Sequence, residues 1–334
     1  PCADEVDVNV IVKDVWTLLP DISFSRGGGE NSSRLGFRDS DFLGTGKSVL
    51  VVRKQNNERS GILFGYGDPN LFGTRNRLSL QYQDNDDGQV QHFSLAHPFF
   101  SLNDTWTSGV SFNQNERIDS LYFRGDEYQH FFQDEREIHA YLGFSSGLVD
   151  NRTHRFTFGV SEERSYFQPT IETTTATPLP SDRQYQYPWM SWQTIEDNFV
   201  KATHINQMSQ TEDLNLGLSA HVQIGYAQAD KFRDEDATIV RADIQQFVAL
   251  SKKLTFYYQL SGSTYWQSDG PQQQVLQVLN RLYFNHAEQR QWAATLELTH
   301  GVNLFVDQPL TIGGDSGLRG YPIHYQTGNR RALL

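Results

Sequence analysis

Residues 214–226 read Leu-Asn-Leu-Gly-Leu-Ser-Ala-His-Val-Gln-Ile-Gly-Tyr, an unbroken alternation of apolar side chains with polar or small ones. Successive side chains of a strand point to opposite faces of a sheet, so this alternation predicts a β-strand with one apolar and one polar face. The stretch exceeds the roughly 9–11 residues that a tilted strand needs to cross a bilayer. It therefore predicts a strand of the length found in transmembrane β-barrels.

Shorter runs with the same alternation recur from about residue 16 onward. Between them, short turns alternate with longer polar connections, a pattern typical of an outer-membrane barrel with short turns on one rim and long loops on the other. We expect about fifteen strands before residue 304, and an odd number places the next loop on the outer rim. The expected short turns are residues 43–46, 68–70, 103–104 and 251–252, and the expected long loops are residues 84–88, 116–135, 170–183 and 229–236.

The composition fits a membrane barrel better than a soluble sheet protein. Only 37% of the 334 residues are hydrophobic, whereas 13% are aromatic, which is a poor composition for a thick core and a good one for aromatic girdles. A soluble β-sandwich is the alternative, but its strands are usually about five or six residues long. No run approaches the roughly 18 apolar residues of a spanning helix.

Charge and cysteine content exclude other classes of protein. The net charge of −12 argues against a nucleic-acid partner, which would require a basic stripe. Cys2 is the single cysteine, so neither an internal disulfide nor a thiolate metal site is available. The chain has no His-Glu-x-x-His pair and no phosphate-binding glycine loop, so we expect no enzymatic activity, no metal and no cofactor.

A glycine-rich stretch near the end carries one conspicuous arginine. Residues 311–321 read Thr-Ile-Gly-Gly-Asp-Ser-Gly-Leu-Arg-Gly-Tyr, and the glycines allow the backbone to fold back through a confined space. Arg319 lies between the apolar residues Leu318 and Tyr321, and an arginine buried there would need a carboxylate partner. Glu297, on the polar face of the preceding strand, is one candidate partner. Alternatively, Arg319 lies in a surface turn and is solvated, and Glu297 is a solvated carboxylate.

Residues 310–321, followed by Gly-Asn-Arg-Arg-Ala at residues 328–332, resemble the signature of the BamA/TamA superfamily of outer-membrane assembly and translocation barrels, the POTRA-associated bacterial surface antigen family. The turn at residues 41–46, Asp-Phe-Leu-Gly-Thr-Gly, is also similar to one in that family. The resemblance implies a lumen loop over residues 304–329 that carries Gly313, Gly314, Leu318, Arg319, Gly320 and Tyr321.

The same resemblance implies the domain organisation. The alternating valines of residues 6–12 look like the last strand of a periplasmic POTRA domain, so we expect residues 1–15 to end that domain and residues 16–334 to form the barrel. The implied fold is an all-β, transmembrane antiparallel β-barrel of 16 or more strands in the full protein. Its closing strands, and the family's acidic partners of Arg319, would lie beyond Leu334.

The resemblance also implies a function. Family members assist the insertion of proteins into the bacterial outer membrane, or their translocation across it, through a weak barrel seam and periplasmic POTRA domains. Here Ile22, Phe24 and Arg26 would form one side of the seam, and the flexible Gly27-Gly28-Gly29 run after them would either weaken pairing or be simply a flexible loop. The expected partners are outer-membrane lipid, a client outer-membrane or secreted protein, and accessory periplasmic proteins of a Gram-negative cell. A passive diffusion pore, and a barrel that anchors or exports a fused upstream domain, remain as alternatives.

Overall fold

The computed structural model describes residues 15–171, 173, 178–203, 205, 210–231, 235–287, 290–314, 316–318 and 320–333. Almost all of this chain is strand, and a single antiparallel sheet of 16 strands dominates it. Its strands are β1 (Leu18–Gly27), β2 (Glu30–Asp39), β3 (Ser48–Gln55), β4 (Ser60–Asp68), β5 (Arg77–Asn85), β6 (Gly88–His97), β7 (Trp106–Phe123), β8 (Asp126–Val149), β9 (Arg152–Pro169), β10 (Arg183–Glu196), β13 (Ser219–Ala227), β14 (Ala237–Ser251), β15 (Leu254–Gln267), β16 (Gly270–Ala287), β17 (Arg290–Val302) and β20 (Arg330–Leu333).

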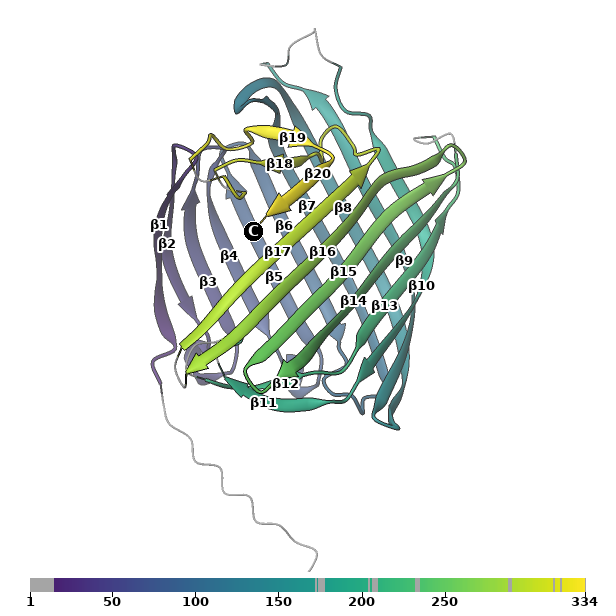
Figure 1. Ribbon diagram of the computed structural model, residues 1–334. Coiled ribbons are helices and arrows are strands. Elements are labelled where there is room, and N and C mark those ends of the chain that lie inside the picture. Colours follow the sequence, from purple (N-terminus) through teal and green to yellow (C-terminus); the bar gives the residue numbers. More distant parts are fainter. Residues whose placement is uncertain are drawn as a thin grey trace, which may run out of the picture.

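The strands follow one another in chain order, and the sheet curls round a central space (Figure 1). Fifteen of its strands precede the 303–329 segment, as the sequence predicted, and that segment lies across the upper mouth in the view of Figure 1. β1 pairs with β2 at one end and β20 with β17 at the other. Within the described residues no ladder joins β1 to β20, so these two strands are the edges of the sheet.

The register of the sheet sorts side chains into rows on its two faces. On the outer face of β8–β10, Phe144, Phe156 and Trp192 form one row, and Leu142, Phe158 and Met190 form the next. These large apolar side chains are between 37% and 59% exposed. The inner face of the same strands carries polar rows, including Glu137 with Glu163 and Glu135 with Ser165. The alternation therefore places an apolar belt outside and polar groups inside.

The prediction of a long loop at residues 116–135 is wrong, because these residues belong to β7 and β8, which form one extended hairpin. The hairpin reverses at Arg124 and Gly125, both in the left-handed region. Its polar residues bond across the strands instead of to solvent: Arg117 Nη1 donates to Glu135 Oε2 at 2.6 Å. Residues 84–88 are likewise a tight reversal between β5 and β6. The polar side chains of these segments therefore belong to strands that extend the sheet above the apolar belt, and not to solvated loops.

The 214–226 stretch is two strands, not one. β11 (Phe199–Thr203) and β12 (Thr211–Asn215) form a separate hairpin at the lower rim, and β13 begins at Ser219. The Asn215 side chain fixes the corner, since its Nδ2 donates to the Glu196 carbonyl at 2.8 Å and its Oδ1 accepts from Gly217 N at 2.8 Å. An ideal Cβ on Gly217 would lie 2.3 Å from the Glu196 carbonyl oxygen, so the corner depends on a glycine.

The predicted short turns all fall between strands on the lower rim, but only the one at residues 251–252 is a tight reversal, because residues 40–47, 69–76 and 98–105 form longer connections. In the turn at residues 41–46, Gly46 N donates to Asp41 Oδ1 at 2.5 Å, and Gly44 and Gly46 have positive φ. The expected strand at residues 6–12 lies outside the described residues. In the part of the chain that the structure describes, no helix has the length and apolar character needed to cross a membrane.

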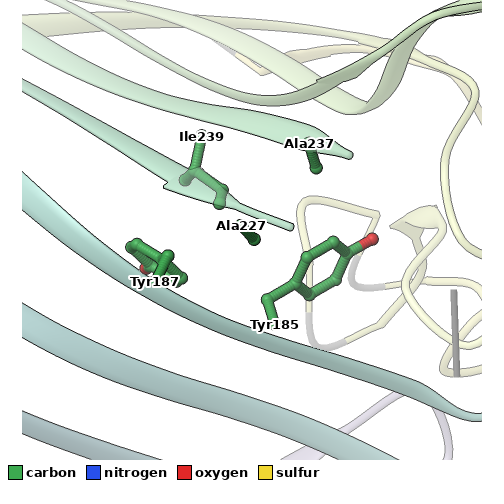
Figure 2. Close-up of a cluster of buried hydrophobic side chains, with 5 residues drawn as sticks. All are labelled: Tyr185, Tyr187, Ala227, Ala237 and Ile239. Atoms are coloured by element: carbon green, nitrogen blue, oxygen red, sulfur yellow. The ribbon is translucent and has the colours of Figure 1, made fainter. Parts of the chain in front are cut away.

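The main buried cluster lies on the inner face where β13 ends (Figure 2). It consists of Tyr185 and Tyr187 of β10, Ala227 of β13, and Ala237 and Ile239 of β14. The two alanines are fully buried, and their small side chains leave room for the tyrosine rings. This packing stiffens the wall beside the place where the 303–329 segment docks.

Candidate functional site

The candidate site is the lumen segment, defined as residues 303–329 between β17 and β20. Within it β18 (Leu310–Ile312) pairs with β19 (Gln326–Gly328), and the tip between them folds back on itself. Leu318 N donates to the Gly313 carbonyl at 2.9 Å and Gly314 N to the Pro322 carbonyl at 3.1 Å. A Cβ on Gly313 would lie 2.5 Å from His324 N. Glycines are therefore required where the two limbs of the tip cross.

The other predicted residues of this motif take different places. Leu318 and Tyr321 are partly exposed, at 37% and 48%, and the Tyr321 ring lies 4.8 Å from the ring of Tyr325. Gly320 has open space around the position of a Cβ. Arg319 lies outside the described residues.

One end of the lumen segment is held by a buried ion pair. Arg183 of β10 donates from Nη1 to Asp307 Oδ1 at 2.8 Å and from Nη2 to Asp307 Oδ2 at 2.7 Å. The Asp307 side chain is 0% exposed and that of Arg183 is 12% exposed. The guanidinium also lies 4.0 Å from the ring centroid of Phe305, so it gains cation–π attraction as well as a bidentate bond.

A polar network in the wall stands behind this ion pair. Phe305 lies against Tyr265 of β15, with ring centroids 6.1 Å apart, and Tyr265 donates to Glu163 Oε2 at 2.6 Å. Glu163 also accepts from Arg241 Nη2 at 2.7 Å, and Arg241 Nη1 donates to the Tyr187 hydroxyl at 2.7 Å. β9, β10, β14 and β15 thus present one connected platform to the lumen segment.

The tip of the lumen segment reaches the turn between β1 and β2. A Cβ built on Gly28 would lie 2.7 Å from Ile323 N, and one built on Gly314 would lie 2.1 Å from Gly28 Cα. A Cβ on Gly27 would lie 3.1 Å from the Gly314 carbonyl oxygen. The two glycine-rich stretches that the sequence presents separately are therefore in backbone contact.

His324 supplies a further contact, with the turn between β3 and β4. Its Nε2 lies 3.3 Å from Glu58 Oε1, and its ring centroid lies 4.3 Å from that of Tyr122. The hydrogen bond with His324 is the main cause that holds the pKa of Glu58 below its ordinary value of 4.5. The carboxylate is therefore ionised at neutral pH and available to the imidazole.

Glu297 is bonded to an arginine on the adjacent edge strand. Its Oε1 accepts from Arg331 Nη2 of β20 at 2.6 Å, and both side chains are about a quarter exposed on the inner face. This contact fastens the short β20 to β17, in addition to their four-residue ladder. The expected partnership with Arg319 stays a prediction.

The predicted seam residues lie on the edge strand β1. Ile22 and Phe24 point to the outer face and are 57% and 76% exposed, and Arg26 precedes the Gly27–Gly29 turn. On the inner face, Arg34 of β2 donates to both oxygens of Asp21, at 2.5 and 2.7 Å. This tie holds β1 to β2, while the other backbone edge of β1 has no partner among the described residues.

Sequence reasoning missed Arg183 and Asp307. Arg183 ended an expected loop, and Asp307 lies in the unremarkable run Val-Asp-Gln-Pro, so only the predicted crossing of the lumen could have suggested a carboxylate there. Residues 143–147, Gly-Phe-Ser-Ser-Gly, match the pattern of a serine nucleophile elbow. They lie inside β8 at a bulge, not at the turn from a strand to a helix, and the Ser145 hydroxyl accepts from Gly147 N.

Three comparisons with known proteins complete the description. No protein-family model matches the chain, and no curated protein matches it. Among the solved structures that match is the crystal structure of BamA from Haemophilus ducreyi lacking POTRA domains 1–3, with a TM-score of 0.41 and 12% sequence identity. The match covers 87% of this chain and 59% of that chain, so the chain spans about three fifths of its length.

Proposed function

We propose that this chain forms the wall of an outer-membrane barrel that assists the insertion or translocation of proteins, with β1 as the strand that receives them. The apolar outer rows of β8–β10 suit lipid, and the polar inner rows suit an aqueous lumen. Within a bilayer, every backbone group of a spanning structure needs a partner. An edge strand is therefore either closed by another strand of the protein or available to a strand from outside.

The observation that carries the proposal is the position of β1. It pairs with β2 along its whole length and exposes Ile22 and Phe24 on its outer face. Whenever no strand of the protein closes it, such an edge is a template for an incoming strand, which adds by β-augmentation. The Gly27–Gly29 turn and the tie between Asp21 and Arg34 let the β1–β2 hairpin keep its own register while its other edge changes partner.

The test is site-specific crosslinking in cells that express the full protein. A photoreactive amino acid at Ile22 or at Phe24 should form adducts with other outer-membrane or exported proteins. Phe158, on the apolar outer face of β9, is the matched control, since it is 49% exposed but far from either edge in strand order. It should form adducts with lipid alone. Equal protein adducts at all three positions, or none at any, would contradict the proposal.

A passive pore is the second candidate, and the space around the lumen segment bears on it. Cavities of about 260 and 460 Å³ lie on either side of residues 305–309. Both cavities are lined by residues of the segment and by residues of the wall, so open space remains beside the segment. If the protein is a pore, cells that lack the whole protein should show altered small-solute uptake and an unchanged inventory of outer-membrane and secreted proteins. Selective loss of one or a few of those proteins would support the assembly role.

A further inference from the structure

We infer that the lumen segment positions the edge strand β1 through the backbone contact between Gly28 and the Gly314–Ile323 tip. The segment thereby sets how readily β1 can pair with an incoming strand. This inference rests on the proposed function of β1 and assigns its control to a second part of the chain. The contact joins the two ends of the sheet in sequence, because Gly28 follows the first strand and the tip precedes the last one.

The contact is too close for a side chain on either partner. A Cβ on Gly28 would lie 2.7 Å from the Ile323 nitrogen and 2.8 Å from its Cγ2, and a Cβ on Gly314 would lie 2.1 Å from the Gly28 nitrogen. Distances below about 3 Å to backbone atoms cannot be relieved by a rotamer change, so the two segments would have to separate. Only glycine on both sides permits this packing.

The tip is held from the other directions as well. Pro322 lies against the β7–β8 turn, where a Cβ on Gly125 would be 2.6 Å from the Pro322 Cβ. His324 meets Glu58 of the β3–β4 turn, and the start of the segment is fixed to β10 by Asp307 and Arg183. The lumen segment is therefore a brace between the long wall and the β1–β2 turn, and it limits how far the β1–β2 hairpin can move.

Gly29 gives a matched control in the same turn. Gly28 and Gly29 both have positive φ, at 59° and 89°, so alanine strains the backbone at either position. Around Gly29 nothing lies within 4 Å of a Cβ. Only Gly28→Ala should therefore displace the tip, while both variants report the strain within the turn.

The first measurement is hydrogen exchange of the β1 amides in the full protein in lipid. Gly28→Ala should speed exchange over residues 18–27 about tenfold, and Gly29→Ala should change it much less, because opening rates report the local free energy. Asp307→Ala leaves the turn untouched and releases the segment from the wall, so it should speed the same amides even if Gly28→Ala fails to fold. Equal acceleration by both glycine variants, or none by Gly28→Ala and Asp307→Ala, would overturn the inference.

The second measurement is crosslinking from Phe24 in the same variants. If the brace sets availability, protein adducts should rise several-fold in Gly28→Ala and stay near the wild-type level in Gly29→Ala. If Gly28→Ala speeds hydrogen exchange in β1 but leaves the yield of protein adducts from Phe24 unchanged, the lumen segment does not control the pairing of β1 with incoming strands. If the wild-type protein forms no protein adducts from Phe24, the proposed function fails, and the exchange data still decide whether the brace positions β1.

Discussion

Arg183 and Asp307 are separated by 124 residues in the chain and meet in a bidentate ion pair inside the curled sheet, in which the Asp307 side chain is fully buried. The acidic partner belongs to the lumen segment and the arginine to the wall. The sequence motif predicts an additional pair with the arginine on the segment, at Arg319, which lies outside the described residues. The ion pair and its cation–π contact with Phe305 make β10 the point from which the brace starts.

Removing one partner of this ion pair should be strongly destabilising. Asp307→Ala leaves the Arg183 charge buried without a carboxylate, and such a loss typically costs about 3–5 kcal/mol. The midpoint of heat-modifiable gel migration, or of urea unfolding in lipid vesicles, reports the loss. The control is Arg152→Ala, whose pair with Glu196 is 52% and 34% exposed and should contribute about 0–1 kcal/mol. Similar shifts in both variants would refute the special role of Arg183 and Asp307.

The contact between Glu58 and His324 should depend on pH. The pKa of Glu58 is lower in the folded protein, so its stabilising contribution is present above the unfolded value of 4.5 and is lost as the pH falls through the lowered folded value. Proteolysis of the lumen segment should therefore increase in acid, below about pH 4.5. Glu58→Gln should show faster cleavage at neutral pH and little further increase in acid. An unchanged acid response in that variant would mean that other groups control the segment.

Phe158 tests whether the outer rows meet lipid. Phe158→Arg in the middle of the belt should lower the free energy of unfolding in vesicles by about 2–4 kcal/mol, because a charge on the lipid-facing side is poorly solvated. Gln186→Arg, in the row of Glu162 above the belt, should cost about 0–1 kcal/mol. Equal effects at the two positions would indicate that the belt is not in a membrane.

Glu163 tests the platform behind the lumen segment. Glu163→Gln weakens the charged hydrogen bond from Arg241 and the bond from Tyr265, so stability should fall by about 1.5–3 kcal/mol. Heat-modifiable migration again measures the effect. Glu137→Gln is the control, since Glu137 lies opposite Glu163 in the register and is attracted by Arg241 without accepting a described hydrogen bond from Arg241 or Tyr265. A larger shift in Glu137→Gln would show that the network around Arg241 is unimportant.

The sequence predicted the architecture well because strand alternation is a local property. Periodicity alone indicated an all-β antiparallel sheet and about fifteen strands before the lumen segment. It failed where polar residues were interpreted as solvated loops. Arg117 and Glu135 bond to each other across β7 and β8, and no local pattern distinguishes such a pair from charges in a loop.

Interruptions of a regular pattern were also hard to predict. Residues 214–226 alternate without a break, yet the chain bends where Asn215 donates to the Glu196 carbonyl of another strand and accepts from Gly217 N. At the candidate site, too, local sequence features could be predicted but contacts between distant residues could not. The sequence identified the glycines of the tip, while the partners Arg183 and Gly28 depend on contacts that only the curled sheet creates. We also expect Arg319→Ala to ease unfolding while it keeps the strand content, and the same gel assay would measure this.

The contact between Gly28 and Gly314 also bears on how the protein itself matures. Its two sides are separated in the chain by the strands from β2 to β17, so we expect it to form after most of those strands have been placed. Contacts of such long range form late and slowly, because a large loop must first be closed. The turn between β1 and β2 would then remain unsecured until the lumen segment has been placed, so the contact is a late step in the folding of this part of the barrel.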